Sequence, residues 1–122
     1  MDSEELKRRT KTFAHRCVKL ALSLHDSPLE RHLKIQLIRC STSVAANYRA
    51  ACMGQSKASF ISKLSIVLEE TDESCFWMEF VIEEKIKKLE QVQPLLNEGE
   101  ELKAIFTTSL KTSRNNKKYQ KK

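Results

Sequence analysis

Glycine and proline, the residues that most often interrupt regular structure, occur only twice each in this chain of 122 residues. Three of these four lie between stretches of helical periodicity, namely Pro28, Gly54 and Pro94. They divide the chain into four segments, and none of the segments keeps the period of two that a half-buried strand requires. The fold is therefore expected to be all-α, with four helices.

Capping residues and apolar spacing predict where these helices begin and end. Ser3 can cap the first helix, and Ser27 can cap the second with Pro28 at its first helical position. Ser56 or Ser59 can open the third helix. The expected helices are residues 3–24, 28–53, 57–91 and 95–110. Their short connections favour an antiparallel, up-down-up-down four-helix bundle that forms one domain over residues 1–110.

The net charge of +6 comes entirely from the end of the chain. All sixteen acidic residues and sixteen of the 22 basic ones lie in residues 1–110, so that part is neutral. Residues 111–122 lack apolar periodicity and are expected to form a basic, disordered tail. The tail is either a solubilising extension or an arm that neutralises phosphates. Its basic residues are Lys111, Arg114, Lys117, Lys118, Lys121 and Lys122.

The neutral body is polarised along the sequence. Residues 1–50 hold ten basic and five acidic side chains, whereas residues 64–101 hold three basic and eleven acidic ones. This pattern either pairs neighbouring helices within a subunit or favours head-to-tail contact between subunits, which closes into a ring if the rotation allows it. Lys7, Arg8 and Lys11 on the outer side of the first helix are either solvated residues or contacts to nucleic-acid phosphates. No aromatic residues interleave with them, so base stacking is not supported.

Residues 40–48, CSTSVAANY, form an uncharged stretch in a chain of which 31% is charged. As a helix, this stretch presents small residues on all sides, which allows neighbouring helices to approach closely. The pattern favours an oligomer interface, and tight packing within one subunit is the alternative. The candidate interface residues, one of them on the third helix, are Ser43, Ala46, Asn47, Ala50 and Trp77.

Two carboxylates interrupt an apolar face of the third helix. Glu70 and Glu73 fall at helical spacing between large apolar residues, and unpaired charges on a buried face would be costly. Arg39 and Arg49, which bracket the uncharged stretch, are the candidate partners for bidentate bonds. The sequence thus predicts a structural ion-pair network of these four residues, formed either within or between subunits.

Motifs of catalysis and cofactor binding do not occur in the sequence. It contains no Glu-x-x-His pair, no Gly-rich phosphate loop and no GxSxG. Its four cysteines form no CxxC pair and are expected to be free packing residues. The chain starts without an apolar signal segment and has no 18-residue apolar run. We therefore expect a cytoplasmic protein with no catalytic residue, metal, cofactor, small-molecule substrate or membrane contact.

Three segments carry a family likeness: QLIRCSTSVAANYRAA (36–51), SKASFISKLSIVLEETDESCFWMEF (56–80) and TKTFAHRCVKLALSL (10–24). Together they resemble bacterial four-helix-bundle proteins associated with intervening sequences in 23S ribosomal RNA genes. One departure from the family pattern is Ala50, where relatives often have Glu. The most specific positions are Arg39, Ser43, Asn47, Ser56, Lys57, Phe60, Glu70, Glu73 and Trp77.

The resemblance implies a four-helix bundle that commonly assembles as a homopentameric ring. Related accessory proteins of diversity-generating retroelements bind nucleic acid and a reverse transcriptase through a basic pentamer. We therefore expect a non-enzymatic, ring-forming bundle that binds RNA or a ribonucleoprotein through basic surface residues. The alternative is an oligomeric scaffold for protein interactions with no nucleic-acid role.

Overall fold

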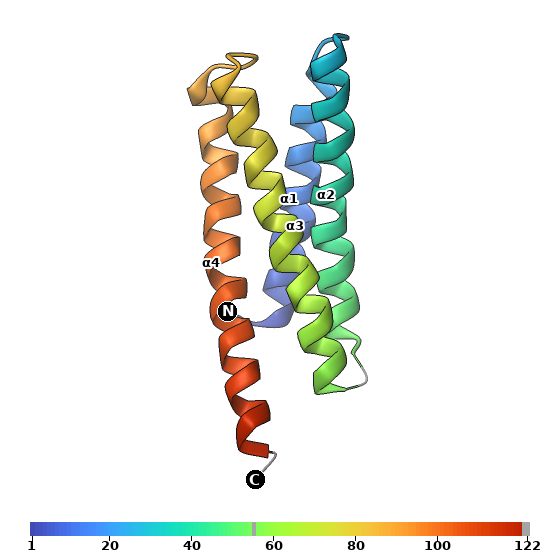
Figure 1. Cartoon of the computed structure of the whole chain (residues 1–122), viewed down its shortest axis with the longest axis vertical. Helices are drawn as coiled ribbons and strands as arrows, with labels where there is room; N and C mark the ends of the chain where they lie inside the picture. Colours follow the sequence, from blue (N-terminus) through green and yellow to red (C-terminus); the bar gives the residue numbers. More distant parts are fainter. Residues whose placement is uncertain (55, 121–122) are drawn as a thin grey trace.

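The computed structural model describes residues 1–54 and 56–120, with the side chains of residues 1–54 and 56–115 (Figure 1). This part of the chain folds into four helices, and it contains no strand: α1 (Ser3–Leu22), α2 (Pro28–Cys52), α3 (Lys57–Glu83) and α4 (Leu89–Gln120). Each helix packs beside the next one in the chain, and α1 and α4 also meet, though less extensively than these consecutive pairs. The predicted all-α four-helix bundle is confirmed, and its first two helices end within two residues of the expected positions.

Side-chain caps determine where the first three helices begin. Asp2, and not the predicted Ser3, caps α1, because its carboxylate accepts a hydrogen bond from the Glu5 N–H at 2.8 Å. Ser27 caps α2, as the sequence predicts, and Ser56, one of the two predicted candidates, caps α3. Each such cap stabilises its helix by about 1 kcal/mol, since it satisfies a backbone donor that has no partner inside the helix.

The third helix is shorter than predicted, because α3 ends at Glu83 and not at residue 91. Lys85 adopts a positive φ of 58°, and its N–H donates to the Ile82 carbonyl at 3.0 Å. The Ile86 N–H donates to the Val81 carbonyl, also at 3.0 Å. This pair of bonds is a Schellman motif with lysine at the position where glycine is usual. The apolar spacing of three and four residues continues beyond Glu83 to Ile86 and Leu89, and for this reason the sequence predicted a longer helix.

The fourth helix begins earlier and ends later than predicted. The Gln91 side chain accepts a hydrogen bond from the Lys88 N–H at 3.1 Å, and this bond caps the helix from Leu89. Pro94 lies inside α4, near its first turn, where it removes one backbone bond. The backbone stays helical to Gln120, so residues 111–120 do not form the predicted disordered tail. Figure 1 shows this segment extending past the other helices, at the end where both termini lie.

The core is one cluster of apolar side chains from all four helices. Gly99 of α4 faces this cluster, where an added Cβ would lie 2.7 Å from the Cys75 Sγ and 3.2 Å from a ring carbon of Phe13. Close packing of α4 against α3 and α1 therefore requires this glycine. The largest fully buried side chains include Phe13, Leu33, Leu37, Leu64, Met78, Leu102 and Phe106.

Ion pairs connect α4 to its neighbours at the surface. The Arg9 guanidinium of α1 donates to both carboxylate oxygens of Glu98, at 3.0 and 2.5 Å. The Lys103 ammonium of α4 bonds to Asp72 of α3 at 3.0 Å, and this bond raises the pKa of Lys103 to about 12. These ion pairs within the subunit join some of the basic and acidic residues that lie in different parts of the sequence. Other charged side chains remain without such a partner among the described residues.

Candidate functional site

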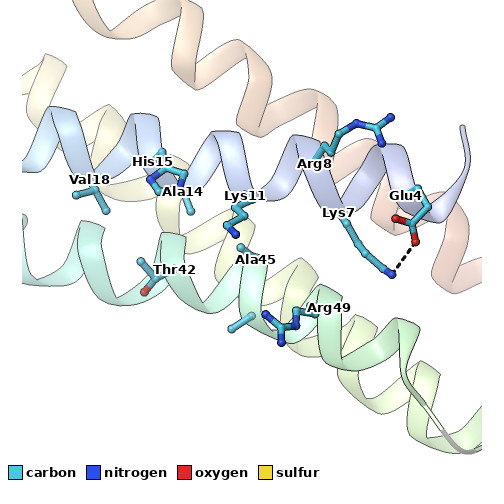
Figure 2. A pocket seen from close by; sticks show the side chains of 11 residues that line it. Glu4, Lys7, Arg8, Lys11, Ala14, His15, Val18, Thr42, Ala45 and Arg49 are labelled. Atoms are coloured by element: carbon cyan, nitrogen blue, oxygen red, sulfur yellow. Dashed lines mark hydrogen bonds and ion pairs between the residues drawn. The ribbon is translucent and has the colours of Figure 1, made fainter.

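A groove of about 620 Å³ runs between α1 and α2 (Figure 2). It exists because α2 presents small side chains to α1 along the uncharged stretch, and these leave the space between the helices unfilled. Its floor is formed by Ala14, Val18, Thr42, Ala45 and Ala46, and its polar rim by Glu4, Lys7, Arg8, Lys11, His15 and Arg49.

Cations dominate the rim of this groove. Lys7 bonds to Glu4 at 2.8 Å, and this bond raises the pKa of Lys7 (Figure 2). Within the described part of the chain, Arg8, Lys11 and Arg49 form no ion pair. The structure therefore brings together the three α1 residues singled out as nucleic-acid candidates. It adds Arg49, which the sequence had assigned to a different site.

The predicted ion-pair network forms around Arg39 alone. Its Nη1 lies 3.3 Å from Glu70, its Nη2 donates to Glu73, and both carboxylates belong to α3 of the same subunit. Glu73 also accepts a hydrogen bond from the Trp77 indole N–H at 3.0 Å. The prediction that Arg49 joins this network is wrong, because Arg49 lies a further three helical turns along α2, on the rim of the groove.

The network is only partly buried, although the sequence suggested a buried face. The Arg39 side chain is 46% exposed and that of Glu73 is 34% exposed. Partial burial raises the pKa of Glu73, but hydrogen bonds from Trp77 and Arg39 lower it by more, so its pKa lies below the ordinary value. Pairs this exposed are worth at most about 1 kcal/mol each, so the network orients α2 on α3 more than it stabilises the fold.

Trp77 belongs to a partly exposed aromatic cluster that the sequence did not reveal as a unit. The Trp77 ring centroid lies 4.9 Å from that of Phe76 and 6.2 Å from that of Phe80. His32 of α2 meets the same indole edge-on at 5.3 Å. Phe76 is 51% exposed, although aromatic side chains usually lie inside. Trp77 and Phe80 are partly buried and pack against the core, so Phe76 is the exposed member of the three.

The uncharged stretch of α2 is buried on one side only. Its core side packs into the bundle, whereas Thr42 and Ala46 are exposed. Asn47 uses its amide within α2, where it donates to the carbonyl oxygen and the hydroxyl of Ser43 at 3.0 and 2.9 Å. Ala50 is half-buried. Packing within one subunit therefore accounts for part of the small residues, and the oligomer interface stays a prediction.

The four cysteines are free, as the sequence predicts, and Cys17, Cys40 and Cys75 are buried. Burial raises the pKa of the Cys40 thiol to about 11 and that of the Cys75 thiol to about 12. In the described residues, no three His, Cys, Asp or Glu side chains come together as metal ligands do. No helix of the described residues has the length and apolar character needed to cross a membrane.

The basic residues of the predicted tail lie on the end of α4 or beyond it. Lys111 and Arg114 are exposed on the segment that extends past the bundle. Lys117 and Lys118 belong to the helical backbone of that segment, but their side chains lie outside the description. Lys121 and Lys122 lie outside the described residues.

The fold and these surfaces define a class: small four-helix bundles with a basic groove between their first two helices. More narrowly, the chain belongs to the 23S rRNA-intervening sequence protein family, whose model matches residues 3–108. A solved structure with the same fold is a protein of unknown function from the S23 ribosomal protein family of Bacteroides thetaiotaomicron VPI-5482. It is 32% identical, with a TM-score of 0.83 over 91% of this chain and 99% of that one. No curated protein matches the chain.

Proposed function

We propose that this protein is a non-enzymatic bundle that assembles into a ring. In this proposal it binds RNA or a ribonucleoprotein through basic side chains at the end of the bundle where both termini lie. The observation that carries the RNA proposal is the convergence of cations from three helices at that end. Arg8 lies near the start of α1 and Arg49 in the last turn of α2, and Lys111 and Arg114 follow Leu110, the last buried side chain among those of α4 that the structure describes.

The distribution of acidic residues supports the same assignment. No Asp or Glu follows Glu101, and none lies between Glu30 and Glu69, so the second half of α2, the start of α3 and the end of α4 carry no carboxylate. Asp2, Glu4 and Glu5 lie at the start of α1 at this same end, and Glu4 is paired with Lys7, so phosphates would approach over α2, α3 and α4 rather than over the first turn of α1. The rim has no Phe, Tyr or Trp side chain on which bases could stack, and its one aromatic ring is the imidazole of His15. The expected mode is therefore recognition of backbone phosphates and shape, as for double-stranded RNA.

A salt titration tests this proposal on the full chain with a structured RNA. Each phosphate contact that is lost should reduce the slope of log affinity against log salt by roughly 0.7–0.9. Arg8→Ala with Arg49→Ala, and separately Lys111→Ala with Arg114→Ala, should each weaken binding and flatten this slope. The matched control is Lys19→Ala with Lys88→Ala, which removes two exposed cations from the opposite end of the bundle. An equal loss in the control, or no loss in either test pair, would overturn the proposal.

A protein-interaction scaffold is the second candidate function, and the exposed Phe76 of the α3 aromatic cluster favours it. A half-exposed phenylalanine beside a tryptophan is more typical of a protein interface than of a solvated helix face. A protein that assembles but shows no salt-dependent RNA binding would support the scaffold over the RNA proposal.

A further inference from the structure

A second cavity, of about 360 Å³, lies between the last turns of α1 and the start of α4. These helix ends are at the end of the bundle away from both termini (Figure 1). Pockets that hold small molecules begin near this size, at roughly 300 Å³. The basic residues that line the cavity are Arg16, Lys19 and Lys87, and the apolar ones are Leu20, Pro94 and Leu95.

The alignment of α1 with α4 leaves an arginine of this cavity without a partner. The two helices run in opposite directions, and Arg9 of α1 pairs with Glu98 of α4. Seven residues further along α1 is Arg16, and seven residues back along α4 is Gln91. Seven residues are about two helical turns, so this pair repeats the position of the first one, and both residues line the cavity. An uncharged amide therefore lies where the repeat would place a carboxylate.

The positive charge of the cavity is not neutralised from within it. Among the described residues, its three cations form no ion pair and no Asp or Glu lines the cavity. Hydrogen bonds from the His25 N–H and the Ser27 hydroxyl lower the pKa of Glu30, and the charge of Lys87 adds to this effect. Glu30 is thus within electrostatic reach of Lys87, but both of its oxygens already accept these bonds at the start of α2.

Gln91 adds a neutral donor to the cavity. Its Oε1 accepts a hydrogen bond from the Lys88 N–H at 3.1 Å, and this bond holds the side chain in place. Its Nε2 has no acceptor among the described residues. The Ser23 hydroxyl, in contrast, donates to the Leu20 carbonyl at 2.6 Å and can only accept from a ligand. The cavity therefore offers donors from three cations and one amide.

We propose that this cavity binds the phosphate group of a small phosphorylated molecule. A phosphate monoester carries roughly two negative charges and three acceptor oxygens, which three cations and an amide N–H can satisfy together. Leu20 and Pro94 give the rest of the molecule an apolar surface to contact. The site is separate from the residues proposed to bind RNA, which lie at the other end of the bundle.

A small anion suits this end of the bundle better than a nucleic acid does. Asp26, Glu83, Glu84 and Glu90 are all exposed there. A long strand with a negative charge at every phosphate would pass close to these carboxylates and be repelled by them. A single phosphate group can enter among the three cations and avoid this repulsion.

Calorimetric titration of the full chain with phenyl phosphate, and separately with inorganic phosphate, tests the site. Sodium chloride at equal ionic strength is the blank, and it should give no binding heat. Phenyl phosphate is expected to bind more tightly than inorganic phosphate, because its ring contacts Leu20 and Pro94. Equal affinities would overturn the assignment of a phosphorylated molecule and leave a site for free phosphate.

Two neighbouring lysines provide a matched pair of variants. Lys87→Gln is expected to weaken phenyl phosphate binding by about tenfold, as the loss of one charge-assisted hydrogen bond would. Lys88→Gln removes the adjacent exposed charge, which does not line the cavity, and should leave the affinity unchanged. Equal losses in both variants would mean that only the overall charge of the protein attracts the anion.

Gln91→Glu should close the site and leave the fold intact. Glutamate can also accept from the Lys88 N–H, so the cap of α4 is retained. Its carboxylate would face Arg16 as Glu98 faces Arg9, so phosphate binding should be lost without a decrease in melting temperature. Undiminished binding by this variant would overturn the proposal.

Nuclear magnetic resonance locates the bound phosphate. The side-chain amide signals of Gln91 should shift when phenyl phosphate is added to the unchanged protein. The amide of Gln93, which donates to Asn97 outside the cavity, is the internal reference and should not shift. Shifts confined to residues elsewhere, or no binding of phenyl phosphate at all, would overturn the proposal.

Failure of this site and failure of the RNA proposal are distinguishable. Lys19→Ala with Lys88→Ala should weaken phenyl phosphate binding and leave RNA binding unchanged. Arg8→Ala with Arg49→Ala should have the reverse effects. Loss of both activities in the first pair would overturn the separation of the two sites.

Discussion

The Arg39 guanidinium on α2 lies 3.3 Å from the Glu70 carboxylate on α3, and the same guanidinium donates to Glu73. One arginine therefore fixes the register of two neighbouring helices through two carboxylates one turn apart. The side chains that form this contact are partly solvated, which limits what the contact contributes to the free energy of unfolding.

Arg39→Ala is expected to lower the free energy of unfolding by about 1 kcal/mol, measured by urea denaturation. A loss of several kcal/mol would be expected only if the change left a buried carboxylate unpaired, and Glu73 retains its bond from Trp77. Arg31→Ala is the control, since Arg31 and Asp26 form a more exposed pair. A loss above about 3 kcal/mol for Arg39→Ala would show that the network is buried in solution.

The pH dependence of stability should include a contribution from Glu73. Its pKa is lower in the folded protein than the ordinary 4.5, because hydrogen bonds from Trp77 and Arg39 outweigh the effect of partial burial. The unfolded chain therefore takes up a proton first as the pH falls. The stabilisation is complete above pH 4.5 and is lost as the pH decreases through the folded-state pKa. Glu73→Gln should flatten the stability curve in that acidic window and leave its slope unchanged above neutral pH, as thermal melts in matched buffers would show.

Lys85→Gly should stabilise the protein by about 1 kcal/mol, although it removes a charge and adds a flexible residue. Lys85 has a φ of 58°, and the left-handed conformation costs a residue with a Cβ about 1–2 kcal/mol. Glycine avoids this cost, while the added freedom of the unfolded chain offsets part of the gain. Thermal denaturation would measure the change, with Lys88→Gly as a control at a nearby position. A lower melting temperature for Lys85→Gly would contradict the Schellman assignment.

Gly99→Ala should destabilise the protein, even though alanine favours a helix over glycine by about 1 kcal/mol. The new Cβ would lie 2.7 Å from the Cys75 Sγ, which cannot occur without displacing α4 or the thiol. Overpacking of this kind costs about 1–3 kcal/mol, so the net effect should be a loss. Adding Cys75→Ala should recover part of that loss, and a double-mutant cycle would measure the coupling. Additive effects of the two substitutions would show that they do not meet.

Deletion of residues 111–122 should leave the stability of the bundle within about 0.5 kcal/mol of the full chain. Up to residue 115, where the described side chains end, Leu110 is the last buried side chain of α4, and the segment after it extends beyond the other helices (Figure 1). Circular dichroism should show the loss of helical signal from the removed residues alone. A cooperative loss of structure would mean that the α4 extension packs against something in solution.

The number of helices and their buried faces could be predicted because both follow from local periodicity. Leu64, Val67, Thr71 and Met78 lie in the core, as their spacing of three and four residues predicts. The end of α3 could not be predicted in this way. Lys85 ends the helix with a left-handed backbone conformation, which is usual for glycine and is not expected from a lysine in the sequence. The same limit applies to α4, whose cap is a glutamine bond to the Lys88 N–H rather than a proline boundary.

Prediction of the candidate sites was limited by something else: the sequence does not show how one helix is aligned along its neighbour. Two arginines bracket the uncharged stretch, and either could have met the α3 carboxylates. Only the alignment of α2 against α3 decides that Arg39 does so and that Arg49 lies on the groove rim instead. The bond from Arg9 to Glu98 joins residues 89 positions apart and had no signal in the sequence. The sequence showed the small residues on the α2 side of the groove, but it did not show which helix lies opposite them.

The buried thiols have a practical consequence for measurements of how the bundle opens. Cys17, Cys40 and Cys75 lie in the core, whereas Cys52 is only half-buried near the end of α2. A thiol-specific reagent should modify Cys52 in the folded protein, but it can reach the other three only when helices separate. Because α1, α2 and α3 each carry one core cysteine, the order in which these three are modified would show which helix leaves the bundle first. The protein therefore contains its own set of probes for local unfolding, one for each of its first three helices.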